Sequence, residues 1–587
     1  MLKLRSLFAA AVLGASSLFL YAKPEPADFV LRNAKIITVD QKFSTAEALA
    51  VRADKIVAVG SDRKIAEWIG PNTQVMDAGG KTVMPGLYDS HVHSYKASVS
   101  EFGGGAPLVH SIAEAQDWIR KQAAQKKAGE WIVLERVYAT RLKETRLPTK
   151  AELDEPAPLN PVLWNSGPVA VVNSKALELS GITRDTPNPT PGEIVKDPKT
   201  GEPTGILRNA AQLLKNPKSN RPPTAQEQRE AVKHLHHLYN EQGITSIGER
   251  RTESEAIDLF RDMEKTGELT VRVNCTRMME PVPKSIGEAI AKLDELTTGT
   301  NKTADYGPTG HGDDWVRIGP LKVLLDGGML IGTAYMREPW GVHDVYQITD
   351  PKYRGILNVQ PELLNALYLE AAKRGWQLTA HCTGEASMDV LLDCYTKIGK
   401  DIGYRKVQQQ RFLITHANFA SERNFAICKA LHIGADMQPA WLYKDGASLV
   451  ETLGERRMNW FMPLKTWFDN GLVVGGGSDH MVQLDSIEST NPWNPWLGLW
   501  TVLTRKTERD GILNPKECLT REQAIRFYTI NNCTINFEEA KKGSLEPGKL
   551  ADLIMIDRDI LKCPIENIRD TKVLLTMVGG KIVWKKE

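Results

Sequence analysis

Through the middle of the chain, short runs of consecutive apolar residues alternate with longer stretches in which apolar residues recur every three or four positions. Runs of the first kind are typical of strands buried on both faces, and stretches of the second kind are typical of helices with one buried side. The predicted helices include residues 285–296, 361–374 and 421–432. This alternation predicts parallel β/α units, in which each helix returns the chain to the same end of a sheet.

Eight of these apolar runs are candidate core strands, and eight β/α units close into a TIM barrel. The runs are residues 82–93, 244–249, 270–275, 321–326, 377–382, 411–416, 435–439 and 472–479. We therefore expect an α/β fold with a TIM (β/α)8 barrel built from residues 82–94 and 244–535. The interval 95–243 is too long for one crossover and carries helical patterns of its own, so it predicts an insert domain after barrel strand 1.

The two ends of the chain carry a different pattern. Residues 23–81 contain short strand-like runs separated by Gly, Asp and Asn, and residues 536–587 contain similar runs. This pattern is typical of a small β layer. Neither end has enough strands for a sandwich alone, so together they predict one discontinuous N- and C-terminal β-sandwich domain beside the barrel.

The first residues have the three parts of a secretory signal peptide. Lys3 and Arg5 precede an apolar run over residues 7–20, and Tyr21-Ala22 closes it. Residues 1–22 are therefore predicted to be a signal peptide cleaved after Ala22. A retained anchor is the alternative, because Leu20 is larger than the residue favoured there. No later run is long enough to span a membrane, so we expect an exported periplasmic or secreted protein with no stable membrane insertion after cleavage.

Composition restricts the class of partner. The formal net charge is +2, with 42% hydrophobic and 25% charged residues, which is typical of a globular protein and does not indicate nucleic-acid binding. The seven cysteines lack CxxC spacing, and we expect mostly buried small hydrophobic side chains with no assignable disulfide. A small-molecule substrate is the expected partner, and the sequence is compatible with a homo-oligomer.

Several predicted strands end in residues that bind metals or carry protons. In a strand, His91 and His93 lie two positions apart and share one face. The carboxyl ends of barrel strands form a single rim, where barrel active sites lie. Each of these residues has an ordinary structural explanation alone, but together on one rim they indicate a metal site. The rim residues are His91, His93, Lys322, His381, His416 and Asp479.

Four motifs together resemble the metal-dependent amidohydrolase superfamily. They are Met84-Pro85-Gly86-Leu87-x-Asp89-x-His91-x-His93, the histidines in Thr379-Ala380-His381 and Ile414-Thr415-His416, Gly477-Ser478-Asp479, and the tail that begins Lys542-Gly543-Ser544-Leu545. The insert, with Arg146-Leu147-Pro148-Thr149 and Val172-Asn173-Ser174, resembles the branch that includes N-substituted formamide deformylases.

This resemblance implies a hydrolase that cleaves a non-peptide C–N bond of a small amide or formamide-like compound with metal-activated water. It implies that His91, His93, His381, His416 and Asp479 hold one or two divalent metal ions, with Zn²⁺ expected, and that Asp479 is the catalytic base. Lys322 would be a carboxylated lysine that bridges two metals, or a plain ammonium beside one. Two alternatives stay open: an esterase, lactonase or cyclic amidase with the same centre, and a non-catalytic metal-dependent binding protein.

Substrate contacts are predicted at Glu249, Arg250 and His480, which follow or end two of the strands. The adjacent Arg250-Arg251 would suit a carboxylate-bearing substrate, although an unpartnered surface pair explains them equally well. Three acids, Glu249, Asp326 and Glu385, are further candidate ligands. Pro168 stands where the deformylase-like branch carries a His in an Asp-Gly-His run, so recognition cannot be carried over from that branch.

Overall fold

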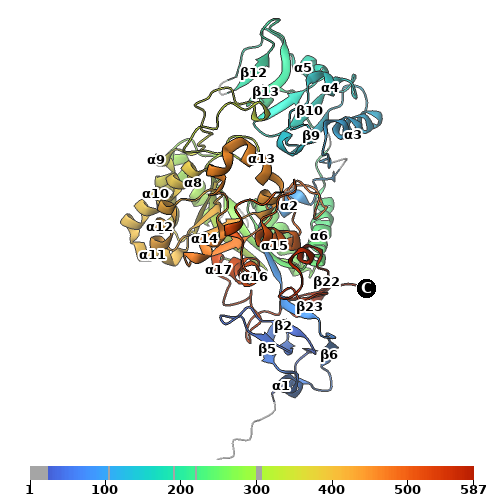
Figure 1. The fold of residues 1–587 in the computed structure, drawn as a ribbon, viewed down its shortest axis with the longest axis vertical. Helices are drawn as coiled ribbons and strands as arrows, with labels where there is room; N and C mark the ends of the chain where they lie inside the picture. Colours follow the sequence, from blue (N-terminus) through green and yellow to red (C-terminus); the bar gives the residue numbers. More distant parts are fainter. Residues whose placement is uncertain (1–23, 103–105, 190–191, 219–220, 299–306, 510) are drawn as a thin grey trace, which may run out of the picture.

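A computed structural model describes residues 24–102, 106–189, 192–218, 221–298, 307–509 and 511–587. The predicted signal peptide, residues 1–22, lies outside the described residues. In Figure 1 the chain forms three parts along its long axis, with an insert at the top, a barrel in the middle and β layers at the bottom.

The predicted barrel is confirmed, and the fold class is α/β. Its eight strands are parallel and lie in the order β20-β19-β18-β17-β16-β15-β14-β8. Val92, at the end of β8, pairs in parallel with His480, beyond β20, at the seam where the sheet closes. The strands are β8 (Leu87–Val92), β14 (Ile244–Glu249), β15 (Arg272–Met278), β16 (Val316–Leu324), β17 (Leu378–Cys382), β18 (Leu413–His416), β19 (Gly434–Met437) and β20 (Val474–Gly476).

Helices surround this sheet, and those predicted from the sequence are present within a few residues. The helices of the barrel part are α7 (Ser254–Lys265), α8 (Ile286–Thr298), α9 (Pro361–Lys373), α10 (Glu385–Ile402), α11 (Tyr404–Gln410), α12 (Glu422–Leu431), α13 (Pro439–Met458), α14 (Leu464–Asp469), α15 (Pro495–Thr504), α16 (Arg521–Phe527) and α17 (Ile530–Ile535). One large apolar core joins the strands to these helices.

The run predicted as the first barrel strand, residues 82–93, is divided between two sheets. Its first part, β7 (Thr82–Pro85), pairs with the terminal β layers, and only β8 enters the barrel. The break falls at Gly86, where a Cβ atom would lie 2.2 Å from Thr245 Oγ1. Only a residue without a side chain fits so close to its neighbour, so the chain changes sheets at this glycine.

The ends of the chain form the two sheets of the predicted sandwich. One sheet has the order β5-β4-β1-β6, and the other has the order β23-β22-β21-β7-β2-β3. The strands are β1 (Phe29–Arg32), β2 (Lys35–Ile37), β3 (Thr45–Ala46), β4 (Ala48–Arg52), β5 (Lys55–Gly60), β6 (Gln74–Asp77), β21 (Leu553–Ile556), β22 (Val573–Val578) and β23 (Lys581–Lys585). A buried ion pair, Arg272 Nε to Asp552 Oδ2 at 2.7 Å, links this layer to the barrel.

The insert has a sheet of its own with the order β12-β13-β11-β10-β9. Its elements are α3 (Ile112–Gln125), β9 (Ile132–Glu135), α4 (Lys150–Asp154), β10 (Val162–Asn165), β11 (Val169–Val172), α5 (Ser174–Ser180), β12 (Glu193–Lys196) and β13 (Pro203–Arg208). The next helix, α6 (Ala225–Glu241), packs against β14, β22 and β23. The last helix of the 95–243 interval therefore lies with the barrel and the sandwich and not with the sheet of the insert.

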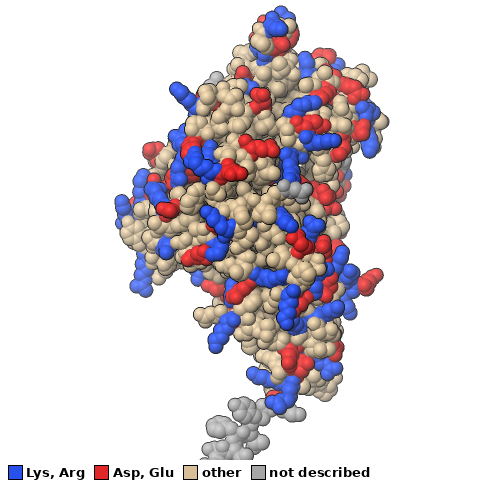
Figure 2. All heavy atoms as spheres, viewed as in Figure 1, with Lys and Arg blue, Asp and Glu red and all other residues tan. Residues whose placement is uncertain are grey.

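The surface and the cysteines agree with the composition. Figure 2 shows basic and acidic side chains interspersed over the visible face. All seven cysteines are free, and five of them are buried. Within the described ranges, no helix is both long and apolar enough to cross a membrane.

Candidate metal centre and active-site cavity

Three of the predicted ligands converge at the seam where the barrel closes. His91 lies in β8, His93 directly follows this strand and Asp479 follows β20, and their ligand atoms all lie within 4.8 Å of one another. The Oδ1 atom of Asp479 is 3.3 Å from His91 Nε2 and 3.2 Å from His93 Nε2. Two imidazole nitrogens and a carboxylate oxygen at one point are a suitable donor set for a divalent metal.

Three of the four rim histidines are held in orientation through their Nδ1 atoms. His91 Nδ1 donates to Asp436 Oδ2 at 2.9 Å, and His416 Nδ1 donates to Gln438 Oε1 at 2.7 Å. His381 Nδ1 donates to Asp326 Oδ1 at 3.0 Å. Such second partners fix the tautomer and leave Nε2 free to ligate.

His381 and His416 form a second group beside the first. Their ring centroids are 4.5 Å apart, and the ring of His416 lies 4.8 Å from that of His91. Lys322, in β16, is 3% exposed. Its positive charge acts on the titration of His91 and His416 alike. The structure therefore brings all six predicted ligands to one region, in two neighbouring groups.

The electrostatics favour the protonation states that metal binding needs. Burial lowers the pKa of His91 and of His416 well below the ordinary value, so both are neutral. Burial also lowers the pKa of His93, and the charges of Lys322 and Arg136 lower it further. Burial opposes ionisation of Asp479, but the two histidines and Lys322 outweigh it and hold the pKa of this carboxyl below its usual value.

Lys322 has the chemistry that the carboxylated form requires. Burial lowers the pKa of its ammonium to about 8, although Asp479 and Asp436 counteract this effect. A lysine with such a pKa is partly an uncharged amine near neutral pH, and only the uncharged amine can react with carbon dioxide.

The environment of His91 Nε2 shows whether these residues fit a metal. His91 Nε2 is fully buried and makes no hydrogen bond within the part of the chain that the structure describes. A buried nitrogen with no partner costs free energy unless something satisfies it. A cation coordinated by His91 Nε2, His93 Nε2 and Asp479 would satisfy it, so the residues fit a divalent metal.

Backbone strain is concentrated at the same residues. Asp479 has φ 58° and His416 has φ 75°, in the left-handed region that non-glycine residues rarely adopt. Asp479 is held there because its N–H donates to His91 O at 2.7 Å and its carbonyl accepts from Asn491 Nδ2 at 2.7 Å. Such strain costs about 1–3 kcal/mol per residue and clusters at functional sites.

A cavity of about 410 Å³ opens beside the centre. Asp479, His381 and Asp326 lie on its barrel side, and Arg136, Pro168 and Asn209 come from the insert. Much of the remaining wall is apolar, including Met329, Ile331, Ile356, Leu449, Phe461 and Trp441. Its size and lining are typical of a small-molecule site.

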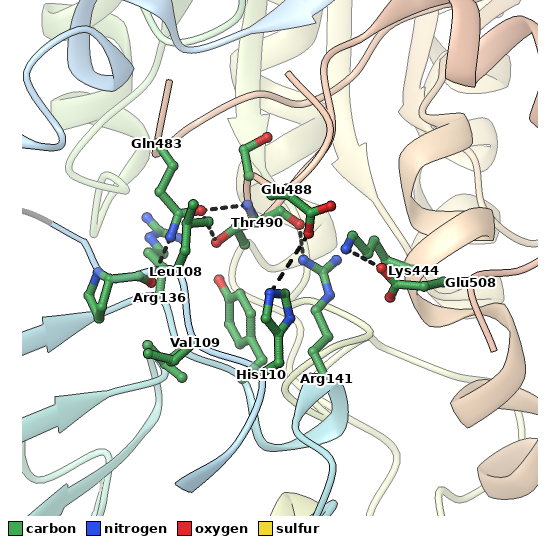
Figure 3. A pocket seen from close by; sticks show the side chains of 14 residues that line it. Leu108, Val109, His110, Arg136, Arg141, Lys444, Gln483, Glu488, Thr490 and Glu508 are labelled. Atoms are coloured by element: carbon green, nitrogen blue, oxygen red, sulfur yellow. Dashed lines mark hydrogen bonds and ion pairs between the residues drawn. The ribbon is translucent and has the colours of Figure 1, made fainter. Parts of the chain in front are cut away.

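A second, smaller cavity lies next to the first, where the insert meets the barrel (Figure 3). Arg141, from the insert, binds Asp445 of α13 through two contacts of 2.8 and 2.9 Å. In Figure 3, the His110–Glu488 and Lys444–Glu508 pairs lie near Arg141, and Arg136 lies beside Gln483. The insert is therefore attached to the barrel by paired charges at the cavity wall.

None of the three residues predicted to bind substrate, Glu249, Arg250 and His480, lines the cavity. Glu249 is 1% exposed and accepts from Ser94 Oγ at 2.5 Å. Arg250 is fully buried behind the centre, with its Nε 3.6 Å from Asp436 Oδ2. His480 uses both ring nitrogens, with Tyr239 Oη at 2.7 Å and Gln483 O at 2.6 Å.

The other candidates for substrate contacts and further metal ligands form hydrogen bonds or ion pairs with other protein residues. Arg251 pairs with Glu280 at 2.6 Å. Asp326 does line the cavity, but its carboxylate holds His381 and accepts from the N–H groups that precede α10. Glu385 lies 3.3 Å from Arg457 Nη2. None of the three acids considered as further ligands belongs to the metal-binding group of described residues.

Three residues of the site, Asp436, Gln438 and Asn418, were not predicted from the sequence. Asp436 interrupts the apolar strand β19, and this is a signal that could have been noticed, because a carboxylate inside a buried strand needs a partner. Asn418 lies two residues after His416 and gives no signal in the sequence. It is fully buried and lines the cavity, and its Oδ1 and Nδ2 have no hydrogen-bond partner among the residues described.

Comparisons with solved structures concern the fold. The chain is similar to an uncharacterized metal-dependent hydrolase from Pyrococcus horikoshii, with a TM-score of 0.65 and 22% identity over 92% of this chain and 99% of the other. A corresponding protein from Pyrococcus furiosus gives a TM-score of 0.64 and 22% identity over 91% and 100%.

Comparisons of sequence extend over almost the whole chain. N-substituted formamide deformylase from Arthrobacter pascens is 27% identical over 95% of this chain and 98% of its own length. The putative amidohydrolase YtcJ from Bacillus subtilis is 26% identical over 94% and 98%. The model of the amidohydrolase family matches residues 74–584. The protein therefore belongs to the amidohydrolase family, as a metal-dependent hydrolase.

Proposed function

We propose that this protein hydrolyses a non-peptide C–N bond of a small amide or formamide-like compound at the rim of its barrel. The observation that carries the proposal is the convergence of His91, His93 and Asp479 beside a cavity of about 410 Å³. The likeness over almost the full length to an N-substituted formamide deformylase supports the choice of an amide bond.

His91, His93 and Asp479 would hold one divalent cation, with Zn²⁺ as the expected ion. His381 and His416 would hold a second, and Lys322 would lie between the two groups, carboxylated if both ions are present. A cation bound there lowers the pKa of a water molecule and polarises the carbonyl of an amide. The Nδ1 atoms of His91, His381 and His416 already have hydrogen-bond partners, so little reorganisation of these side chains is needed when a ligand enters.

Asp479 is the proposed general base and acid. Its carboxyl has a lowered pKa, so it is ionised at neutral pH and can accept a proton from the attacking water. The same group then protonates the leaving amine nitrogen, so that the amine departs neutral. Asn491 Nδ2 lies 3.3 Å from Asp479 Oδ2 and helps to hold the carboxylate in place.

The cavity wall can orient an amide and an apolar group. Asn418 presents an unpartnered donor and an unpartnered acceptor, which an amide can satisfy together. Trp441 stacks on His416 at 4.5 Å and offers an apolar face next to the centre. Pro168 adds apolar surface from the insert, where it neither ligates nor donates. A substrate with an apolar substituent near its amide fits this lining.

Metal analysis and a substrate panel test the proposal together. We expect the purified protein to contain at least one equivalent of divalent metal, and a chelator to abolish hydrolysis of N-formyl and N-acetyl amines. The panel includes matched esters and lactones, because activated water attacks these as well. Faster turnover of esters than of amides would favour an esterase. Metal without turnover of any compound would favour a binding protein, and protein without metal would contradict the proposal.

We also propose that the enzyme is exported. The support is the basic and apolar pattern of residues 1–22, which has the features of a signal peptide. Fractionation of cells that produce the full chain tests this point, since an exported protein is recovered outside the cytoplasm and starts after Ala22.

A further inference from the structure

The insert places one arginine on the wall of the active-site cavity. Arg136 directly follows β9 and lines this cavity together with Asp479 and His381. Its side chain is exposed to the open space and is close enough to the centre for its charge to act on His93 and on Asp479. A positive charge therefore faces the place where a substrate would lie.

The backbone of Arg136 is held in an unusual conformation. Its φ is 61°, in the left-handed region, and its N–H donates to Asn165 O at 2.9 Å. The neighbouring Glu135 accepts from Asn165 Nδ2 at 2.8 Å. Both residues at the end of β9 are thus tied to the end of β10, and a bulky residue remains in a left-handed position only when its surroundings enforce it.

The acids of the cavity are already engaged. Asp326 holds His381, Asp445 is bound by Arg141, and Asp479 belongs to the metal-binding group. Among the described residues, Arg136 interacts with the Tyr138 hydroxyl but makes no ion pair with a carboxylate. Arg136 is therefore available to an anionic ligand.

The charges nearby limit how much negative charge the ligand can carry. In the adjoining cavity of Figure 3, Arg141 from the insert and Lys444 from the barrel are further cations, and they pair with Asp445 and Glu508. The charges of Asp479 and Glu135 act on Arg136, but neither carboxylate forms an ion pair with it among the described residues. Its single guanidinium can therefore bind one carboxylate with two parallel hydrogen bonds. A phosphate dianion would need a second free cation.

We propose that Arg136 recognises a carboxylate on the substrate and thereby selects N-acylated compounds that bear an acid, such as N-acyl derivatives of apolar amino acids. This inference rests on the proposed function, because it concerns the same cavity. The amide lies at the metal-binding residues, the apolar substituent lies against the apolar wall, and the carboxylate reaches the insert side. Arg136 acts on specificity and takes no part in the bond-breaking step.

The test compares two compounds that differ only in the acid. N-acetylphenylalanine carries the carboxylate, and N-acetylphenethylamine lacks it. The unaltered, metal-loaded protein is expected to prefer the acid. In Arg136→Met, the ratio of kcat/KM for the acid to that for the neutral compound is expected to fall by about 10- to 100-fold, mainly through KM, since a charge-assisted hydrogen bond is removed. Arg184→Met, on the insert surface where Arg184 pairs with Glu202, is the matched control.

A charge reversal separates recognition from a structural role. Arg136→Glu should prefer an N-acetylated diamine, with its free ammonium group, over N-acetylphenylalanine. A variant that is merely misfolded would lose activity toward both. An unchanged ratio in Arg136→Met, or equal losses for both compounds, would overturn the inference.

Binding measurements keep this inference distinct from the proposed function. Both compounds can be titrated into the metal-loaded protein by calorimetry, whether or not they are hydrolysed. Tighter binding of the acid that Arg136→Met weakens by about 10-fold or more would support the inference even if no amide is cleaved. Binding of neither compound, or equal binding of both, would contradict it.

Discussion

The two walls of the active-site cavity are built in different ways. On the barrel wall, His91, His381 and His416 each have the Nδ1 atom fixed by a side chain from another element. On the insert wall, the backbone of Arg136 is tied to Asn165, but no carboxylate pairs with its guanidinium among the described residues. The contrast indicates that the barrel fixes the chemistry, because ligands must be held accurately, while the insert determines which compounds fit. If this division holds, substitutions on the barrel wall change turnover most, and substitutions on the insert wall change mainly KM.

The largest effect is expected on the barrel wall, at Asp479. Asp479→Asn removes the base and one metal ligand but keeps the size of the side chain. We expect kcat to fall by about 10²- to 10⁴-fold, the usual contribution of general acid–base catalysis. Steady-state kinetics with the preferred amide measure this. Asp401→Asn, an exposed position at the end of α10, is the control, and near-normal turnover by Asp479→Asn would refute the assignment.

An intermediate effect, on metal affinity, is expected at Asp436, which contacts the metal-binding residue His91. Asp436→Asn weakens the support of His91 Nδ1, now at 2.9 Å. Because residues that orient ligands typically contribute 10- to 100-fold, we expect the affinity for Zn²⁺ to fall by about that factor. Competition with a chelating indicator measures the affinity, and thermal unfolding checks that the variant is folded. Unchanged affinity would mean that the barrel wall does not depend on this support.

A smaller effect on kcat is expected at Arg141, which attaches the insert to the barrel. Arg141→Met leaves Asp445, 2% exposed, without its partner. We expect the free energy of unfolding to fall by about 3 kcal/mol, as for other broken buried pairs, and KM to rise more than kcat falls.

The matched control for that pair is Arg120→Met, also on the insert. Arg120 forms exposed pairs with Asp117 and Glu155, and such pairs contribute about 1 kcal/mol or less. Denaturant unfolding and steady-state kinetics compare the two variants. A loss confined to kcat in Arg141→Met would contradict the view that the insert acts on recognition.

The smallest effect on activity is expected at Glu249, whose role is structural. Burial raises the pKa of Glu249 to about 7 from an ordinary 4.5. The folded state therefore holds this proton more tightly than the unfolded state, so the contribution to stability is full below about pH 4.5 and is lost as pH rises toward 7.

Glu249→Gln removes this dependence. Between about pH 5 and about pH 8, the unaltered protein should lose about 2–3 kcal/mol more of its unfolding free energy than the variant does. Urea unfolding at several pH values measures this, with the exposed Glu241→Gln as control. Parallel curves for the protein and Glu249→Gln would show that Glu249 does not titrate as its burial predicts.

Much of the fold could be predicted because periodicity is a local property. Strand β14 and helix α9 have the bounds that their apolar patterns predict, within a residue. The break at Gly86 could not be predicted, because it depends on the approach of Thr245, a residue far away in the sequence.

The candidate site divides in the same way. His91, His93 and Asp479 could be predicted because residues at the ends of barrel strands must share a rim, whatever lies between them. Arg250 and His480 could not be placed, because residues next to a rim position face either the cavity or the packing behind the strands. The direction in which such a residue faces depends on local bends of the backbone, such as the left-handed conformation of Asp479.

The sequence by itself determined the barrel, the family and the six residues of the metal-binding region. The barrel follows from hydrophobic periodicity, the six rim residues follow from residue types at strand ends, and the family follows from the resemblance of the sequence motifs. Only the tertiary structure decided that Asp436 and Gln438 orient the histidines, that Glu249, Arg250 and His480 are buried, and that Arg136 reaches the cavity from the insert. Those facts depend on contacts between different elements, up to the 345 positions that separate His91 from Asp436, and no local pattern specifies them.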